Sequence, residues 1–379
     1  MNVSRRDAEA EQLSLFGGGA GEGVGGGEGG GAERGASAVE AEVGSAGAPE
    51  RVRRVAERLP GVVRMGTSTW SFPGWAGIVY DRKRTSSELA RRGLAAYVQH
   101  PSLRAVGVDR TFYSPMTEEE LGEYADAAPE GFRFLVKANQ ACTFPTLKRR
   151  GAGGGEVEEE NASFMDAGFA LEASVGPAVR GLGEKLGVVL FQFPPMGRRF
   201  WGSGDEFADR LHGFLSALPS GAPIAVEIRN EELCVPRYAA AVADIEACSH
   251  CFVVHPSAAS LSRQAETVRL GDQQQLVCRW MLHAGQSYMG AKGRYEPFDR
   301  LVDPDPVARR GYVELLVEAL SMGKESLVVV NNKAEGSAPL SVMKLAEELV
   351  ESLEEERGGG ERGVGEGAGA GEGAGVGEG

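Results

Sequence analysis

Polar and ionisable side chains close each of eight short runs rich in β-branched and apolar residues. These side chains are Ser68, Asp109, Lys137, Gln192, Glu227 with Arg229, His255, Arg279 with His283, and Asn331 with Asn332. Carboxylates and imidazoles act as acids, bases or metal ligands, whereas lysine, arginine and amides hold phosphate. If the runs are parallel strands, their ends meet at one edge and form a single hydrogen-bonding, partly ionised cluster.

Within this cluster we assign provisional roles from residue type alone. Glu227 is the candidate general base, His283 the acid or a ligand, and Asp109 a second carboxylate for an acid/base pair. The residues expected to bind ligand or phosphate are Lys137, Arg229, Arg279, Asn331, Asn332, Lys333 and Ser68. A plainer alternative stays open, in which Glu227 and Arg229 pair with each other or with Arg279.

Basic and aromatic residues crowd the segments that follow these run ends. Trp70, Trp75 and Tyr113 are candidate stacking platforms, and the segment Asn332–Ser337 leads into a helix whose amides could hold phosphate. Cations position phosphates while flat rings stack on bases or sugars, so the mixture favours a phosphorylated small molecule or DNA. The plainer alternative is that the cations are solvated and the tryptophans fill small loop cores.

A metal site is the main competing chemistry. Asp109, Glu227, His255 and His283 would suit a divalent ion in a hydrolase or a sugar isomerase. The sequence holds only five histidines, and a histidine at a strand end more often serves in hydrogen bonding. We therefore assign no metal ligands and leave the cofactor unknown. The cysteine pair at 248 and 251 indicates packing, because no second pair completes a zinc site.

The elements that must position these residues alternate along the chain. We expect strands at Val62–Trp70, Ala105–Phe112, Phe132–Asn139, Leu186–Phe193, Pro223–Arg229, Cys251–His255, Leu276–His283 and Ser326–Asn331. We expect helices at Thr85–Gln99, Thr117–Ala127, Phe164–Leu182, Asp205–Leu218, Val235–Ala247, Pro306–Met322 and Ala338–Leu353. Eight such units predict an α/β fold, a TIM-type (β/α)8 barrel, although a doubly wound open sheet has a similar pattern.

Composition sets the boundaries of this barrel. Of the 55 glycines in 379 residues, 26 fall in the tracts 17–47 and 358–379, which carry little apolar surface. We predict disordered tails at 1–60 and 357–379, a barrel at 61–356 and a mobile charged loop at Thr146–Glu160.

The sequence shows neither a membrane-length apolar run nor a secretory signal pattern, so we expect a cytoplasmic protein without membrane contact. The net charge of −14 excludes indiscriminate coating by nucleic acid but permits a basic cleft.

Seven ordered motifs resemble one family. They are Gly66–Trp75, Thr111–Tyr113, Phe132–Lys137, Gln192–Pro195, Glu227–Arg229, Arg279 with His283, and Asn331–Asn332 followed by Gly336 and Ala338. Together they resemble the YecE-like family, domain of unknown function 72, from residue 62 to about 350. The resemblance implies a TIM-type barrel and no particular reaction. The sixth run ends in His255-Pro256-Ser257, where many members are acidic.

An apolar pentapeptide stands alone in the glycine-rich N-terminal tract. Its residues Gln12, Leu13, Leu15 and Phe16 resemble the bacterial motif that binds the DNA sliding clamp. A peptide on a flexible tether raises the local concentration of the attached domain at its partner. The alternative is that the segment docks on its own barrel or has no role.

These observations lead to one hypothesis and two alternatives. The favoured one is a DNA-maintenance protein, with phosphodiester or lesion processing by a hydrolase, recruited to the sliding clamp through residues 12–16. The first alternative is a metal-dependent hydrolase or isomerase of sugars or sugar phosphates, and the second is a non-catalytic binding barrel. Substrate, turnover and oligomeric state stay open.

Overall fold

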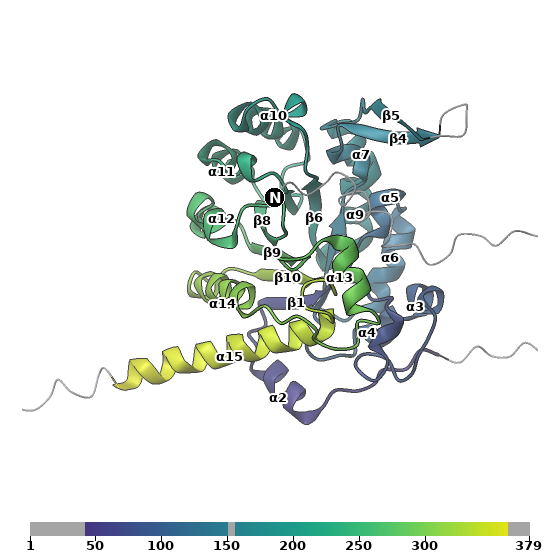
Figure 1. Cartoon of the computed structure of the whole chain (residues 1–379), viewed down its shortest axis with the longest axis vertical. Helices are drawn as coiled ribbons and strands as arrows, with labels where there is room; N and C mark the ends of the chain where they lie inside the picture. The colour runs from purple at the N-terminus through teal and green to yellow at the C-terminus, as the bar shows by residue number, and fades with distance from the viewer. Residues whose placement is uncertain (1–41, 151–155, 363–379) are drawn as a thin grey trace, which may run out of the picture.

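Eight parallel strands close into a barrel in the computed structural model, which describes residues 42–150 and 156–362 (Figure 1). The strands are β1 (Val63–Thr67), β2 (Ala105–Val108), β3 (Arg133–Lys137), β6 (Leu186–Phe193), β7 (Ile224–Ile228), β8 (Cys248–Val254), β9 (Leu276–Trp280) and β10 (Ser326–Val330). Their order around the barrel is β1-β10-β9-β8-β7-β6-β3-β2. All eight expected runs form strands, and the TIM-type barrel is confirmed.

The barrel interior is filled by small and branched side chains. They are Ala105, Leu135, Val188, Leu190, Ala225, Cys251, Val277, Leu327 and Val329. Because side chains alternate along a strand, the residues between them face outward and join the larger core beneath the helices. Cys248 and Cys251 both lie in β8, are buried and form no disulfide.

Helices surround the barrel, and those on one side, α10, α11, α12 and α14, lie in a row (Figure 1). The α-helices are α2 (Glu50–Arg58), α3 (Ser86–Arg92), α4 (Leu94–Tyr97), α5 (Arg110–Tyr113), α6 (Glu118–Ala127), α7 (Gln140–Thr143), α8 (Ala167–Ala170), α9 (Gly176–Leu182), α10 (Gly204–Ser216), α11 (Pro236–Ala243), α12 (Leu261–Thr267), α13 (Tyr288–Tyr295), α14 (Pro306–Ser321) and α15 (Ala338–Arg362). A π-helical turn at Leu171–Val175 joins α8 to α9. The sequence pattern did not predict α12 and α13.

The expected mobile loop at Thr146–Glu160 contains a hairpin. Strand β4 (Thr146–Arg150) pairs antiparallel with β5 (Glu156–Glu160), and Figure 1 shows the pair beyond α7. One strand is basic and the other acidic, and Lys148 Nζ lies 3.2 Å from Glu156 Oε2. Cross-strand attraction between opposite charges therefore orders the described part of this insertion. Residues 151–155 lie outside the described ranges.

The folded region begins before residue 61 and extends past residue 356. Helix α2 packs against α15, with Arg51 Nε 3.0 Å from Glu347 Oε1 and an ion pair between Arg58 and Glu354. Tracts 1–41 and 363–379, including Gln12–Phe16, lie outside the described residues. Over the residues that are described, no helix is long and apolar enough to cross a membrane.

The contact between β1 and β2 depends on a residue without a side chain. Gly66 pairs with Ala105, and a Cβ on Gly66 would lie 1.7 Å from the Ala105 carbonyl oxygen. We expect Gly66→Ala to lower the free energy of unfolding by about 1–3 kcal/mol, because the two strands must move apart. Urea denaturation measures the change. Gly61→Ala is the control, since its Cβ would meet no atom within 4 Å; equal stability of the two variants contradicts the assignment.

Candidate functional site

A polar layer closes the barrel interior at the carboxyl ends of the strands. Each of its members lies two or four residues beyond an interior side chain of its own strand, so alternation turns it inward. The layer comprises Asp109, Lys137, Gln192, Glu227, Arg229, His255, Arg279 and Asn331, all of which are buried. These residues were predicted from their positions at strand ends, and the barrel brings them together.

The centre of this layer is a carboxylate between two guanidinium groups. Arg229 Nε donates to Glu227 Oε1 at 2.7 Å, and Arg279 Nη1 donates to Glu227 Oε2. Both arginines also donate to Gln192 Oε1, from Arg229 Nη2 at 3.2 Å and from Arg279 Nη1 at 3.3 Å. On the far side, Arg229 Nη1 lies 3.4 Å from His255 Nε2. Glu227 therefore pairs with both arginines, which settles the alternative left open by the sequence.

The charge state of Glu227 follows from these contacts. Burial alone would raise its pKa, but Arg279 and Arg229 outweigh burial and lower the pKa to about 2. A carboxylate with such a low pKa is a weak proton acceptor near neutral pH. The geometry therefore argues against Glu227 as the general base and assigns it to holding the two arginines.

Asp109 and Lys137 occupy the side of the layer nearest β2 and β3. Lys137 Nζ lies 3.6 Å from the centre of the Phe112 ring, a cation–π contact. Asp109 Oδ2 is buried and has no hydrogen-bond partner among the described residues. Burial would lower the pKa of Arg279, but Glu227 and then Asp109 raise it, so Asp109 lies within electrostatic reach of that guanidinium.

The two asparagines after β10 have different roles because they face opposite sides. Asn331 faces inward, and its Nδ2 donates to Ser68 Oγ at 2.9 Å. Asn332 faces outward, where its Oδ1 accepts from Trp75 Nε1 at 3.1 Å and from Ala338 N at 2.8 Å. Asn332 thus caps α15. Because Ser337 and Ala338 are buried, a phosphate has no access to the first turn of this helix.

His283 lies away from the Arg–Glu–Arg cluster. Its backbone N donates to the Lys333 carbonyl at 3.0 Å, and its Nε2 lies 3.9 Å from Asp305 Oδ2. Lys333 is buried, and its Nζ lies 4.3 Å from the centre of the Tyr288 ring. The described contacts therefore place His283 and Lys333 beside each other, and they show no contact between His283 and Glu227.

The three predicted stacking residues are placed differently. Trp75 is 1% exposed and supports the loop after β1 from within. Trp70 donates from Nε1 to the Leu89 carbonyl at 3.0 Å and packs edge-on against Tyr124, with ring centres 5.1 Å apart. Tyr113 is half-buried and packs edge-on against Phe112. Trp70 lines a cavity.

That cavity is a cleft of about 790 Å³ over the carboxyl ends of β1, β2 and β10. Its walls are the loop after β1, the exposed side of α3, the first half of α13 and the segment 296–298. The charged residues that line it are Lys83, Arg91, Asp109, Arg110, Lys292, Glu296 and Lys333, and the aromatic ones are Trp70, Phe72, Tyr124, Tyr288 and Phe298. Arg91 and Tyr124 were missed, because they lie on helices rather than at strand ends.

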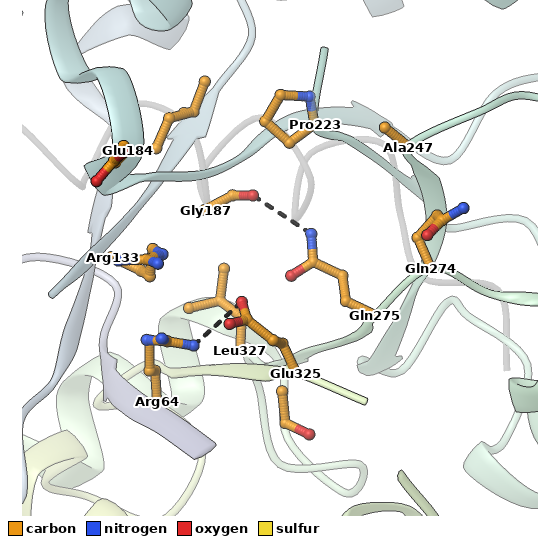
Figure 2. Close-up of a pocket in the computed structure, with 12 residues that line it drawn as sticks. Arg64, Arg133, Glu184, Gly187, Pro223, Ala247, Gln274, Gln275, Glu325 and Leu327 are labelled. Carbon is orange, nitrogen blue, oxygen red and sulfur yellow. Dashed lines mark hydrogen bonds and ion pairs between the residues drawn. The ribbon is translucent and has the colours of Figure 1, made fainter. Parts of the chain in front are cut away.

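A second cavity, of about 310 Å³, lies at the opposite, amino-terminal end of the barrel (Figure 2). Arg64 Nη1 lies 3.1 Å from Glu325 Oε2 there, and Gln275 Nε2 donates to the Gly187 carbonyl at 3.3 Å. Its charges are balanced, with Arg64 and Arg133 against Glu184 and Glu325. In barrels of this type the amino-terminal end serves stability, so the cleft at the carboxyl end is the candidate site.

The four residues considered as metal ligands do not form a ligand cluster. Within the described ranges no group of three or more His, Cys, Asp or Glu side chains is arranged to hold a metal ion. Glu227 has both oxygens engaged by arginines, whose positive charge opposes a cation at the same place. The geometry of this layer suits an anion better than a divalent metal.

Comparison with known proteins relates the chain to one family. Residues 64–360 match the family described as "Protein of unknown function DUF72", and no curated protein matches. A DUF72 family protein from Thermotoga maritima is 17% identical with a TM-score of 0.50, covering 76% of this chain and 98% of that one. A DUF72 family protein from Enterococcus faecalis is 21% identical with a TM-score of 0.48, covering 76% and 95%. A D-tagatose 3-epimerase-like protein is 15% identical with a TM-score of 0.41, covering 67% and 91%. The similarity to the Thermotoga maritima structure supports the barrel fold.

The role of Glu227 as a buried counter-ion is testable. We expect Glu227→Gln to destabilise the protein by roughly 3–5 kcal/mol, because two buried guanidinium groups lose their partner. Glu325→Gln is the control: its carboxylate is 51% exposed and pairs with Arg64 near the surface, so the loss is about 0–1 kcal/mol.

The pH dependence gives a second measurement. The pKa of Glu227 falls from 4.5 to about 2 on folding, so its contribution to stability is present above pH 4.5 and is lost as the pH falls toward 2. Denaturation midpoints between these pH values should fall in the wild type and in Glu325→Gln, and should fall less in Glu227→Gln. Parallel pH profiles for all three contradict the assignment.

Proposed function

The chain belongs to the DUF72 family, as its ordered motifs predicted, and we propose that its barrel binds a phosphorylated ligand of the nucleotide or nucleic-acid type. The site is the cleft over β1, β2 and β10. Because a TIM-type barrel carries its ligands at the carboxyl ends of the strands, the location agrees with the fold.

One observation carries this proposal: the charge of the cleft lining. Five cations face two carboxylates, although the whole chain carries a net charge of −14. Three of the cations, Lys83, Arg91 and Lys292, form no ion pair with any residue in the described ranges. Field lines concentrate in a cleft with low-dielectric walls, so the lining attracts anions despite the acidic remainder.

Aromatic rings in the same cleft favour a ligand with a flat ring. Trp70, Phe72, Tyr124 and Phe298 line it next to the cations, and Trp70 and Tyr124 already contact each other edge-on. Stacking on such rings and contacts to phosphate are the two means by which proteins hold single-stranded nucleic acid. A sulfate-sized anion alone would use only the cations.

DNA maintenance is the biological role that we propose for this binding. Processing of a phosphodiester or a lesion would require an acid and a base, and Glu227 is poorly suited to act as the base. Asp109 and His283 are then the remaining candidates for proton transfer, while Arg279 supplies fixed positive charge.

Binding and its salt dependence test the proposal. We expect Arg91→Ala combined with Lys292→Ala to weaken binding of a labelled single-stranded oligonucleotide at least tenfold at low salt. The slope of log K against log salt should become shallower by about 0.7 for each phosphate that the variant no longer neutralises. Fluorescence anisotropy measures both quantities.

The matched control is Arg53→Ala combined with Arg54→Ala on α2, which removes the same charge outside the cleft. This variant should bind as the wild type does. Absence of wild-type binding at low salt, or an equal loss in both double variants, contradicts the proposal.

Recruitment to the sliding clamp is the second part of the proposed role. It rests on the sequence Gln12–Phe16, which lies outside the described residues. We expect Leu15→Ala combined with Phe16→Ala to abolish capture of purified bacterial sliding clamp, because the motif inserts these apolar side chains into a preformed pocket. Oligonucleotide binding by the barrel should not change. If the double variant still captures the clamp at the wild-type level, this part of the proposal is wrong.

A further inference from the structure

Two buried polar atoms of the polar layer, one of them on a residue that lines the cleft, lack hydrogen-bond partners among the described residues. They are Oδ2 of Asp109, a residue that is 7% exposed and lines the cleft, and Nε of Arg279, which is 1% exposed. A buried acceptor or donor without a partner carries the full penalty of losing its hydration. Such atoms in a native fold indicate a missing partner, either an ordered water or a ligand group.

Asp109 and Arg279 attract each other electrostatically but form no ion pair. No nitrogen of Arg279 lies within 4.0 Å of the Asp109 carboxylate. Arg279 is fixed by Glu227 and Gln192. The turn after Asp109 is fixed by the Thr111 hydroxyl, which donates to the Val108 carbonyl at 2.9 Å or to the Lys137 carbonyl at 2.6 Å. Both charged groups are therefore held in place, and a third group must supply what they lack.

The chemistry of that third group is restricted. Asp109 offers only acceptors when ionised and repels a phosphate, whereas Arg279 offers only donors. A hydroxyl can donate to the carboxylate and accept from a cation, so it satisfies either residue. The cations Lys83, Arg91 and Lys292 lie on the other walls of the same cleft and suit an anion.

We propose that the cleft takes a phosphorylated sugar with a free hydroxyl, and that Asp109 accepts a hydrogen bond from that hydroxyl. This inference rests on the proposed phosphate-binding function and narrows it. The interior of a DNA strand has no free sugar hydroxyl, whereas a strand end, a mononucleotide and a sugar phosphate all have one. The cleft therefore selects an end or a small molecule over the continuous backbone.

The experiment compares ligands that differ by one hydroxyl. Isothermal titration measures binding of thymidine 5′-monophosphate, its 3′-deoxy analogue, deoxyribose 5-phosphate and inorganic phosphate to the full chain. We expect the wild type to prefer thymidine monophosphate over the 3′-deoxy analogue by about tenfold or more, the usual effect of a hydrogen bond to a charged group. Because this comparison changes the ligand, it does not depend on how a variant folds.

Variants assign the preference to Asp109. Asp109→Ala should bind both nucleotides within twofold of each other while retaining inorganic phosphate, and the isosteric Asp109→Asn should be intermediate. Glu296→Ala is the control, since it removes the other cleft carboxylate, which is exposed, and should retain the preference.

The outcomes separate the two proposals. If none of the four ligands binds the wild type, the phosphate-binding function itself is wrong. If both nucleotides bind equally, the function stands, a water satisfies Asp109, and the inference is overturned. If the preference persists in Asp109→Ala, the inference is also overturned. Comparable binding of deoxyribose 5-phosphate supports the inference and identifies a sugar phosphate, whereas weaker binding supports it and identifies a nucleotide.

Discussion

One buried carboxylate holds two buried guanidinium groups at the centre of the barrel, and the polar layer around it depends on this arrangement. Glu227 lies on β7 beside Arg229, and Arg279 reaches it from β9. A guanidinium cannot lose its charge and is costly to bury alone, so each arginine requires the carboxylate. Gln192 on β6 accepts from both arginines, which ties a third strand to the same group. Three strands are thereby fixed relative to one another at the height where a ligand would bind.

This arrangement makes the two ends of the barrel chemically different. At the amino-terminal end Arg64 meets Glu325 near solvent, and the charges of that cavity cancel. At the carboxyl end both oxygens of Glu227 accept hydrogen bonds from its two arginines, and Asp109, the other carboxylate of the polar layer, has a buried oxygen without a hydrogen-bond partner among the described residues. The cleft cations then face an opening in which they outnumber carboxylates. An acidic chain thus presents one basic cleft, at the end of the barrel where ligands bind in this fold.

The sequence predicted the strands and their inward-facing ends because both depend on local pattern. The run Leu186–Phe193 is apolar except for Gln192, and alternation along the strands places Gln192 and Glu227 inside. The cleft was less accessible to prediction, since its walls come from a helix face, a loop and a segment that are distant in the chain. The hydrogen bond from Trp75 to Asn332 spans 257 positions and removes both from the roles expected of them. Helix α13 was missed because its glycines, Gly290 and Gly293, have the composition of a flexible loop.

The state of Glu227 also limits which chemistry the cleft can perform. A carboxylate with a pKa of about 2 stays ionised near neutral pH, so it stabilises positive charge on its neighbours but does not exchange protons there. Arg279 is likewise a permanent cation, held by Glu227 and Gln192 before any ligand enters. Charge that is fixed in advance needs no rearrangement as a reaction proceeds, which is the condition under which it stabilises a developing anion most strongly. Any proton transfer then falls to groups other than Glu227, Arg229 and Arg279. Asp109, which lines the cleft and lies within electrostatic reach of Arg279, is the carboxylate that we propose for it.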